Sequence, residues 1–316
     1  MRAMVINGFG GPEVFEEAEV PKPSPGPTQL LVKVLATSVN PVDFKIRRDG
    51  YWANLTFPAI LGWDVSGVVE EVGAGVTGFK PGDEVFYNAE IGVGQGTYAE
   101  YHVTEEAIVA PKPKDVSHLE AAGIPLAGGT AYEGVVTRAK LMVGETALIH
   151  AAAGGVGMFA VQIAKAAGAY VFGTCRAENA DFVKALGVDR VIDYKTEDYV
   201  EVVNAETGGA GVEFVFDTVG GDTITRSVGC TRKWGRIVTI VAPPGDADGA
   251  GRKNITIHYE FSQRNRAKME ALRTLVERGQ MRPVTDSVMP LTQVAEAHRR
   301  LEAGGVRGKI VLDTSK

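Results

Sequence analysis

The middle of the chain alternates between short apolar runs and helical stretches, and this alternation constrains the fold more than any other feature. The apolar runs are bounded by glycine or polar residues, as strands usually are. Strands that alternate with helices form βαβ units, whose parallel sheet is buried on both faces. The predicted strands lie at residues 146–152, 169–175, 190–194, 212–219 and 235–241. We therefore predict an α/β fold with a doubly wound parallel sheet.

A glycine-rich turn, HAAAGGVG, follows the first predicted strand and runs directly into a predicted helix that starts near Gly155. Ala152, Gly154 and Gly157 have the spacing of a dinucleotide-binding fingerprint, with alanine in place of its first glycine. Gly154 would let the backbone approach a pyrophosphate, and Gly157 would let the helix pack closely against the strand. The helix N-terminus would offer free N–H groups to the phosphates. The surrounding βα units favour a Rossmann dinucleotide-binding domain over a turn that binds nothing.

The residues after the second predicted strand bear on which dinucleotide binds. An acidic residue there would hold the ribose of NAD, whereas a basic one would contact the 2′-phosphate of NADP. The chain reads GTCRAEN, so Thr174 and Arg176 fit a 2′-phosphate. Glu178 is the rival, because a turn would bring it back toward the ribose and leave Arg176 as a solvated surface residue. We predict NADPH as the cofactor and keep this alternative open.

The regions on either side of this domain differ from it in their predicted secondary structure. Short β-rich runs broken by Gly and Pro predict compact antiparallel structure before about residue 123. After about residue 261 we expect two helices and a last strand. Ser262 and Thr292 are the expected N-caps of these helices, and Gly279 and Gly304 are expected to end them. The predicted domains are residues 1–122 and 261–316, two segments of one β-rich domain, and residues 123–260, the dinucleotide-binding domain.

The charge balance argues against several classes of partner. The chain has 33 Lys and Arg against 39 Asp and Glu, a formal net charge of -6. It therefore lacks the overall basic surface that favours nucleic acid or an anionic membrane, although a local basic patch is not excluded by this balance. No apolar run is typical of a signal peptide or long enough to span a bilayer, so we expect a cytoplasmic protein. Two cysteines, Cys175 and Cys230, are too few for a disulfide framework and too isolated for a zinc site.

Six segments together resemble the zinc-independent quinone oxidoreductases of the medium-chain dehydrogenase/reductase superfamily. They are PSPGPTQLLVKV, SVNPVDFKIRRDG, GWDVSGVVEEVGAGVTGFKPGDEV, GTYAEY, HAAAGGVG and GVRGKIVLD, and they extend over nearly the whole chain. The resemblance implies a GroES-like catalytic domain made from both chain ends and a Rossmann domain in the middle. It also implies a cleft between the two domains and a homodimer.

The alcohol-dehydrogenase branch of this superfamily has a cysteine and a His-Glu pair around a catalytic zinc, and often four closely spaced cysteines around a structural one. In this sequence Asn40 stands at the cysteine position and Trp63-Asp64 at the His-Glu position, and the cysteine-rich segment is missing. Amide and indole groups do not replace thiolate and imidazole as zinc ligands. We therefore predict no bound metal, and we expect the five histidines to be structural or exposed.

Without a metal ion, reduction of a simple ketone or aldehyde lacks its usual Lewis acid. Quinones and α,β-unsaturated carbonyls are better hydride acceptors, because the resulting electron pair is delocalised onto an oxygen that hydrogen-bond donors stabilise. We predict an NADPH-dependent quinone oxidoreductase that acts on a small molecule, with no nucleic-acid or membrane partner. Two alternatives stay open: a 2-alkenal or enone reductase of the same family, and a non-catalytic NADPH-binding protein.

The resemblance also assigns candidate site residues by position. The catalytic candidates are Asn40, Asp43, Tyr51, Trp63 and Asp64, with Trp52 beside Tyr51. The cofactor candidates are Thr130, Ala153, Gly154, Gly155, Val156, Gly157, Thr174, Arg176, Tyr194, Asp217, Val219, Val241, Ala242, Pro243 and Lys309. The competing interpretations are core packing for the tryptophans and Tyr194, turn capping or an internal ion pair for the aspartates, and solvent exposure for Lys309.

Overall fold

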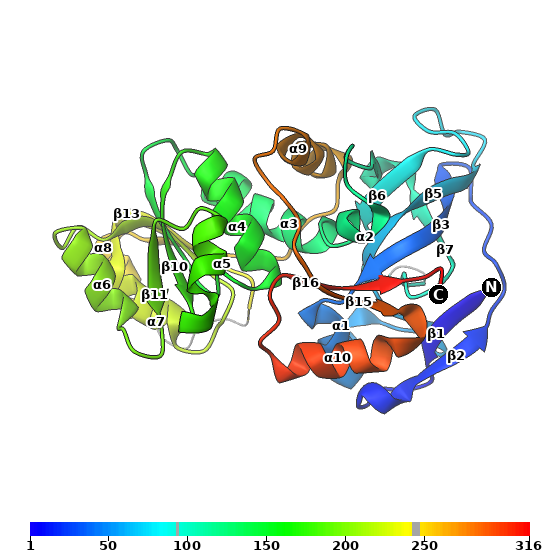
Figure 1. The fold of residues 1–316 in the computed structure, drawn as a ribbon, viewed down its shortest axis with the longest axis horizontal. Coiled ribbons are helices and arrows are strands. Elements are labelled where there is room, and N and C mark those ends of the chain that lie inside the picture. Colours follow the sequence, from blue (N-terminus) through cyan, green and yellow to red (C-terminus); the bar gives the residue numbers. More distant parts are fainter. Residues whose placement is uncertain (93–94, 242–246) are drawn as a thin grey trace. The chain divides into compact units, whose positions relative to one another are not determined.

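A computed structural model describes residues 1–92, 95–241 and 247–316, and the chain forms two compact units. Unit 1 consists of Met1–Gly129 and Gln263–Lys316, so it contains both chain ends, and unit 2 is Thr130–Ser262. Figure 1 follows the elements of both units along the chain. The sequence predicts domain boundaries at residues 122/123 and 260/261, and these boundaries remain a prediction.

Unit 1 is built from strands that pair mostly antiparallel, as the runs broken by Gly and Pro predict. One sheet has the order β15-β16-β3-β5-β6-β8, with β7 paired to β3, and a smaller sheet has the order β2-β1-β4. Only the pair β15–β16 is parallel among the described pairs of this unit. The strands are β1 (Arg2–Ile6), β2 (Phe15–Glu19), β3 (Gln29–Ser38), β4 (Ala59–Ile60), β5 (Asp64–Val72), β6 (Glu84–Asn88), β7 (Tyr101–Glu105), β8 (Ala110–Pro111), β15 (Thr285–Pro290) and β16 (Lys309–Asp313).

The core of unit 1 follows from the two-residue period of its strands. Leu30, Val32 and Val34 occupy alternate positions of β3, and all three are buried in one apolar cluster. Val65 and Val69 of β5 belong to the same cluster. The helices of this unit are α1 (Pro41–Asp49), α2 (His118–Ala121), α9 (Arg266–Glu277) and α10 (Val294–Ala303), and α3 (Pro125–Tyr132) leads into unit 2.

The two C-terminal helices end as predicted but begin elsewhere. Asn265 caps α9, because its side chain accepts the N–H of Lys268 at 2.8 Å, so the prediction of Ser262 as the cap is wrong. Thr292 lies inside a 3₁₀ turn that precedes α10, and it is not the N-cap either. Gly279 and Gly304 follow the helices with φ angles of 68° and 77°, a conformation that glycine adopts at little cost.

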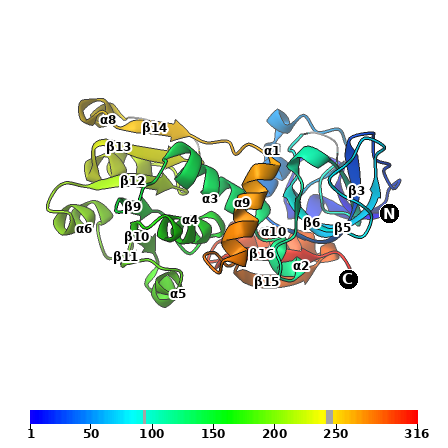
Figure 2. The ribbon, with the colours of Figure 1, turned by 90° about the horizontal axis from the view of Figure 1, so that it is seen from above.

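Unit 2 is a six-stranded sheet in which every pair of neighbours is parallel, in the order β11-β10-β9-β12-β13-β14 (Figure 2). This confirms the predicted doubly wound fold. The strands are β9 (Thr146–Ile149), β10 (Tyr170–Cys175), β11 (Arg190–Asp193), β12 (Val212–Asp217), β13 (Thr231–Thr239) and β14 (Thr256–Tyr259). The helices are α4 (Gly155–Ala166), α5 (Ala180–Ala185), α6 (Tyr199–Glu206), α7 (Thr223–Ser227) and α8 (Asp248–Lys253). The short strand β14 was not foreseen.

Parallel pairing brings the carboxyl ends of these strands to one edge, here called the carboxyl edge, and their starts to the opposite one, the amino edge. At the carboxyl edge Cys175 pairs with Asp193, and Asp217 pairs with Thr239. The predicted cofactor residues that follow β9, β10, β11, β12 and β13 therefore share one edge. None of the described helices is both long and apolar enough to cross a membrane.

Candidate active site

The glycine turn lies between the end of β9 and the start of α4, at the carboxyl edge. Gly154 precedes the helix in an extended conformation, and the left-handed residue of the turn is Ala151, with φ 48°. Ala152, which takes the first glycine position of the fingerprint, follows this residue directly. The hydroxyl of Thr174 accepts the N–H of Ala151 at 3.0 Å, so the neighbouring strand holds this turn in place.

Two glycines of the turn have different physical roles. A Cβ added at Gly157 would lie 2.2 Å from the carbonyl oxygen of Ala151, a contact that no side chain can relieve. A Cβ at Gly154 would meet only that same oxygen, at 3.3 Å. The chain itself therefore requires glycine at position 157, which supports its expected role in close helix packing. At position 154 the chain leaves space in front of the backbone.

The first turn of α4 leaves main-chain donors at the carboxyl edge. Met158 donates to Gly154 at 2.9 Å, the first hydrogen bond of the helix. The N–H groups of Gly155, Val156 and Gly157 come before it, and the first N–H groups of an α-helix have no partner within the helix. Together with the helix dipole they form a site suited to an anion such as a phosphate.

Two polar side chains behind the turn are buried. His150 is bonded through Nε2 to the hydroxyl of Ser227 at 3.1 Å, and burial lowers its pKa to about 4, so the imidazole is neutral. Thr174 is also buried, with its hydroxyl committed to Ala151. The geometry gives the Thr174 side chain a part in shaping the turn, and its expected contact with a 2′-phosphate stays a prediction.

Arg176, Tyr194 and Glu178 form an exposed group just beyond β10 and β11. The Nε of Arg176 donates to the hydroxyl of Tyr194 at 3.2 Å, and one terminal nitrogen lies 3.7 Å from the carboxylate of Glu178. The basic residue and its acidic rival are thus side by side. Both side chains are about half exposed, so the exposure of the two does not decide which of them would contact a ribose.

The other cofactor candidates of unit 2 differ in their surroundings. Asp217 is fully buried, and its carboxylate accepts the N–H groups of Val219 and Gly220 and the hydroxyl of Thr239. It therefore shapes the turn after β12, at which Val219 is exposed. Thr130 is nearly buried in α3, Ala153 lies in the glycine turn, and Val241 follows β13. Ala242 and Pro243 lie outside the described residues.

In unit 1 the predicted residues Asn40 and Asp64 meet in a buried group of hydrogen bonds, here called the Asp64 cluster. The carboxylate of Asp64 accepts the hydroxyl of Ser38 at 2.5 Å, the side-chain amide of Asn40 at 2.8 Å and the N–H of Leu126 at 2.7 Å. The side chain of Asp64 is completely buried. An ionised carboxylate is what such a set of donors stabilises.

Lys309 supplies the positive charge of the Asp64 cluster. Its Nζ donates to the carbonyl oxygen of Val39 at 3.1 Å and to the side-chain oxygen of Asn40, and lies 3.6 Å from Asp64. Burial lowers its pKa, and the two neighbouring aspartates oppose that effect. The solvent-exposed alternative for Lys309 is wrong, since only 4% of its side chain is accessible. An internal ion pair, the alternative interpretation for Asp64, is what the structure contains.

A second buried group, the Asp43 chain, runs from Asp43 through Tyr98 and His298 to Arg47. The guanidinium of Arg47 can only donate, so Nδ1 of His298 accepts from it at 2.9 Å and Nε2 carries the imidazole proton. Nε2 then donates to the Tyr98 hydroxyl at 3.2 Å, and that hydroxyl donates to Oδ2 of Asp43 at 2.6 Å. Every donor in the chain points toward Asp43.

Asp43 also caps its own helix, because Oδ2 accepts the backbone N–H of Asn40 at 2.8 Å. The other carboxyl oxygen, Oδ1, has no hydrogen-bond partner among the described residues. Lys309 is paired with Asp64 and Arg47 with Glu302, at 2.5 Å, and in the described part of the chain no salt bridge reaches Asp43, on which Lys309 acts only from a greater distance. Burial raises the pKa of Asp43 to about 7, although the Tyr98 hydrogen bond opposes the shift. Burial and then Arg47 lower the pKa of His298 to about 3.

The aromatic candidates divide into one buried and two exposed residues. Trp63 is 1% exposed and belongs to the core of unit 1, as its alternative interpretation holds. Tyr51 and Trp52 are 75% and 53% exposed in a short turn after α1. The ring of Tyr51 packs edge-to-face on Phe9 at 4.6 Å, and Phe9 packs on Phe57 at 5.2 Å. Phe9, Tyr51 and Phe57 thus form an aromatic group at the surface of unit 1.

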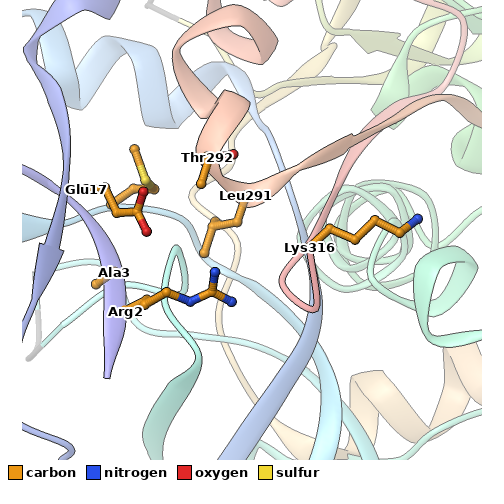
Figure 3. A pocket seen from close by; sticks show the side chains of 7 residues that line it. Arg2, Ala3, Glu17, Leu291, Thr292 and Lys316 are labelled. Carbon is orange, nitrogen blue, oxygen red and sulfur yellow. The ribbon is translucent and has the colours of Figure 1, made fainter.

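A small pocket in unit 1 is unrelated to these residues. It lies among β1, β2, the turn before α10 and the C-terminus, and Figure 3 shows its lining. The lining residues are Arg2, Ala3, Met4, Glu17, Leu291, Thr292 and Lys316. None of them is a predicted site residue, so this pocket does not mark the active site.

Comparison with known proteins places the chain in a family. Residues 26–114 match the alcohol dehydrogenase GroES-like domain, and residues 186–312 match the zinc-binding dehydrogenase domain. The chain is 32% identical to human quinone oxidoreductase over 99% of this chain and 97% of that protein. This chain belongs to the medium-chain dehydrogenase/reductase superfamily. Its sequence resemblance and its predicted GroES-like and Rossmann architecture are thereby confirmed.

Solved structures of the superfamily superpose on nearly the whole chain. A crystal structure of an NAD-dependent alcohol dehydrogenase is 36% identical, with a TM-score of 0.94 over 99% of this chain and 100% of that one. The quinone oxidoreductase of Escherichia coli in complex with NADPH is 31% identical, with a TM-score of 0.90 over 99% and 100%. The two cofactors in these descriptions differ, so the fold leaves the choice between NADH and NADPH to local residues.

The zinc that the dehydrogenase family implies does not fit the residues of this chain. Asn40 uses its amide oxygen for Lys309 and its amide nitrogen for Asp64, and Trp63 offers an indole. A lysine ammonium already neutralises the carboxylate of Asp64. In the part of the chain that the structure describes, no three His, Cys, Asp or Glu side chains are arranged to hold a metal ion.

Sequence reasoning missed several members of the two buried groups. Ser38 and Tyr98 bond directly to predicted residues, whereas His298, Arg47 and Glu302 are linked to Asp43 only through Tyr98 and one another, and none carries a recognisable motif. His298 lies 200 residues from Tyr98 and 251 from Arg47 along the chain, so no spacing pattern links them. A buried Arg in helix α1 and a His on the apolar face of α10 are signals that only the fold makes meaningful.

Proposed function

We propose that this protein is an oxidoreductase that transfers a hydride from NADPH to a quinone and needs no metal ion. The observation that carries the proposal is the start of α4, where free N–H groups follow Gly154 and no side chain covers them at that glycine. The superfamily membership supports a redox reaction. The human relative that is named a quinone oxidoreductase supports the substrate class.

The residues at the carboxyl edge fit a dinucleotide. Gly155, Val156 and Gly157 would donate main-chain N–H groups to the pyrophosphate, and the open backbone at Gly154 would allow its approach, with Ala153 beside it in the turn. Tyr194 and Arg176 would lie at the adenosine ribose, with Arg176 on the 2′-phosphate. When bound, the nicotinamide supplies the hydride, and the protein supplies position and electrostatics.

Unit 1 would provide the substrate side of the reaction. The exposed ring of Tyr51, backed by Phe9 and Phe57, is suited to a flat aromatic molecule, which favours a quinone over an aliphatic 2-alkenal. The Tyr51 hydroxyl is a hydrogen-bond donor for an oxygen that gains negative charge during reduction. The Asp64 cluster would hold Asn40 and the start of α1 rigid, so that Tyr51 and Trp52 keep their place.

The proposal includes a homodimer in the cytoplasm, as the superfamily resemblance implies. Sedimentation velocity tests the dimer, and fractionation of the cells that produce the protein tests the location. A monomer at micromolar concentration would remove the dimer from the proposal without affecting the reaction.

The reaction is tested by following the loss of NADPH absorbance with purified protein and a panel of benzoquinones, naphthoquinones, 2-alkenals and cyclic enones. Turnover of the quinones above the others supports the proposal, and selective turnover of alkenals or enones assigns the alternative reductase. NADPH binding in calorimetry without turnover of any compound would identify a non-catalytic binding protein. Stoichiometric zinc after dialysis, with activity lost to a chelator, would contradict the metal-free reaction.

A further inference from the structure

The amino edge of the unit 2 sheet carries exposed apolar side chains that the proposed function does not use. Val143, in the loop before β9, is 85% exposed, and Met142 beside it is 61% exposed. Trp234, in the irregular first half of strand β13, is 74% exposed, and Tyr170 at the start of β10 is 43% exposed. Large apolar side chains stabilise a fold when they are buried, so their gathering at one edge calls for another explanation.

The strand register places these segments at one level of the sheet. Tyr170 pairs with Thr146 at the start of β9, and Arg236 of β13 is aligned with the second residue of β9 through β12. The guanidinium of Arg236 reaches the carboxylate of Glu145 at 2.7 Å, so the loop before β9 is tied to β13 across the strand between them. Figure 2 shows β10, β9, β12 and β13 as neighbours in this order.

The exposure of Val143 is built into the loop. The carboxylate of Glu145 accepts the N–H of Met142 at 2.9 Å, and Gly144 donates to the carbonyl of Gly168 at 3.1 Å. Tyr170 donates to the carbonyl of Glu145 at 3.0 Å. Val143 therefore stands at the tip of a loop whose backbone is fixed on both sides.

Backbone strain gathers at the same edge. Among the described residues, the left-handed φ angles outside glycine, asparagine and aspartate belong to Lys140, Ala151 and Trp234. Ala151 belongs to the cofactor turn, and the other two lie here, with φ of 50° and 64°. This conformation is unfavourable for a bulky side chain, and Trp234 gains little burial within the chain in return. Such a cost points to a partner outside the chain.

The charges at this edge favour an anionic partner. Glu145 and Glu213 are paired with Arg236 and Arg232, whereas the exposed Lys140 and Lys233 have no ion pair recorded in the described part of the chain. The carboxylates near Tyr170, of Asp189 and Glu206, are likewise paired, with Lys165 and Arg190. The described charges left without an ion pair beside Val143 and Trp234 are thus basic, although the whole chain has a net charge of -6. A second copy facing this edge across a two-fold axis would set like charges against each other.

Against the expectation of no membrane partner, which rested on the net charge of the whole chain, we propose that the amino edge of unit 2 docks on an anionic lipid surface. Val143 and Met142 would enter the headgroup layer from their loop and Trp234 from the irregular first half of β13, and Lys140 and Lys233 would contact the anionic headgroups. Exposed aliphatic side chains beside lysines favour a lipid surface as the partner over nucleic acid or an acidic protein, because aliphatic groups contribute little to binding of the latter two. The proposal concerns the edge opposite the cofactor turn within unit 2, and it does not depend on the substrate of the enzyme.

The test is co-sedimentation of the full chain with phosphatidylcholine vesicles, with and without phosphatidylglycerol. The wild type is expected to bind the anionic vesicles and to be released by salt. Val143→Asp with Trp234→Ser, and separately Lys140→Glu with Lys233→Glu, are each expected to weaken binding at least about tenfold. The matched control is Val288→Asp with Lys114→Glu, which changes an exposed valine and an exposed lysine of unit 1 and should bind as the wild type does.

Three outcomes would overturn the proposal. In the first, the wild type stays in the supernatant with anionic vesicles. In the second, the two amino-edge variants bind as well as the control. In the third, without lipid, the amino-edge variants change a larger assembly into a smaller one, which would make this edge an interface between copies of the chain. Circular dichroism and NADPH binding, measured on each variant, separate lost docking from lost folding. In a Trp52→Phe background, a blue shift of Trp234 fluorescence reports insertion into the lipid, and this background leaves the residues of the amino edge unchanged.

Discussion

The two units treat the polar groups of the candidate site in opposite ways. In unit 1, Asn40, Asp64 and Lys309 are buried, and their charges and hydrogen-bonding groups are used within the protein. In unit 2, the first N–H groups of α4 stay without helical partners beside a glycine that leaves space in front of them. The first region is built to hold a shape, and the second is built to receive a ligand.

This difference separates two meanings of a functional residue. A residue of the Asp64 cluster acts on the site through the elements that it fixes, so its loss should appear first in stability. A residue at the carboxyl edge costs the fold little, so its loss should appear first in affinity. Substitutions in the two regions therefore test whether stability and cofactor affinity are lost separately.

The largest effect is expected for Gly157→Val, which tests the one position of the glycine turn that the fold itself requires. Its Cβ would lie 2.2 Å from the carbonyl oxygen of Ala151, and neither backbone segment can move without separating α4 from β9. We expect a loss of about 4 kcal/mol or more in the free energy of unfolding, measured by urea denaturation.

Gly154→Val is the matched control for that variant, because its Cβ would meet the same oxygen at 3.3 Å. It should leave the fold largely intact and abolish NADPH binding in calorimetry. Unchanged NADPH affinity in Gly154→Val would show that the pyrophosphate does not bind at this turn. If both variants are equally destabilised, the fold requires glycine at both positions.

Lys309→Met should rank next, since it leaves the buried carboxylate of Asp64 without its cation. Removal of one partner of a buried ion pair costs about 3 to 5 kcal/mol. The double variant Lys309→Met with Asp64→Asn should recover part of that loss, because no unpaired charge remains. A single variant as stable as the wild type would show that the Asp64 cluster does not depend on its cation.

Asp43→Asn should change how stability depends on pH. The pKa of Asp43 is about 7 in the folded protein and 3.8 in a model side chain, so between these values the folded chain keeps a proton that the unfolded chain has lost. Stability from this group therefore falls as pH rises from about 4 to about 7, by at most about 1.4 kcal/mol per pH unit, and is level above that.

Buried histidines act in the opposite direction and remain in the variant. His298, with a pKa of about 3, and His102 and His150, with pKa values of about 4, lose stability as pH falls below 6.5. The difference between wild type and Asp43→Asn in urea titrations from pH 4 to 8 isolates the aspartate. If the difference in stability between the two proteins does not change with pH, Asp43 does not take up a proton in the folded protein over this range.

The smallest effect is expected at the surface of the carboxyl edge. Arg176→Ala should weaken NADPH binding about tenfold to a hundredfold, since charge-assisted hydrogen bonds are worth about 1.5 to 3 kcal/mol. NADH affinity should hardly change, because NADH lacks the 2′-phosphate. If Glu178 holds the ribose instead, the wild type should prefer NADH and the variant should be nearly silent for both cofactors.

The sequence predicts the parts of this protein that depend on local patterns. The strands of unit 2 other than β14, the start of α4 and the ends of α9 and α10 follow from apolar periodicity and glycine, because these signals act over a few residues. Asn265 in place of Ser262 as a cap shows the limit of such signals, since several polar residues before a helix are equally suitable.

The partners of the candidate site could not be predicted in the same way. Asp43 and Asp64 are both aspartates near predicted turns, yet Lys309 forms an ion pair with Asp64 and acts on Asp43 only from a greater distance. That difference depends on Tyr98, His298 and Lys309, which the fold brings from distant parts of the chain. The direction of the Thr174 hydroxyl is likewise decided by Ala151 and not by its own sequence context.

The direction of the Asp43 chain also has a kinetic consequence. A proton passes along a row of hydrogen bonds only if each group can accept as well as donate, and Arg47 at the outer end cannot accept. The row therefore carries no proton between Asp43 and the Arg47–Glu302 pair, in which Arg47 is buried and Glu302 is partly exposed. Along this route Asp43 exchanges its proton only when the surrounding structure opens, so after a sudden pH jump its charge should change at the rate of that opening. Until then, the protonation state of Asp43 would still correspond to the earlier pH.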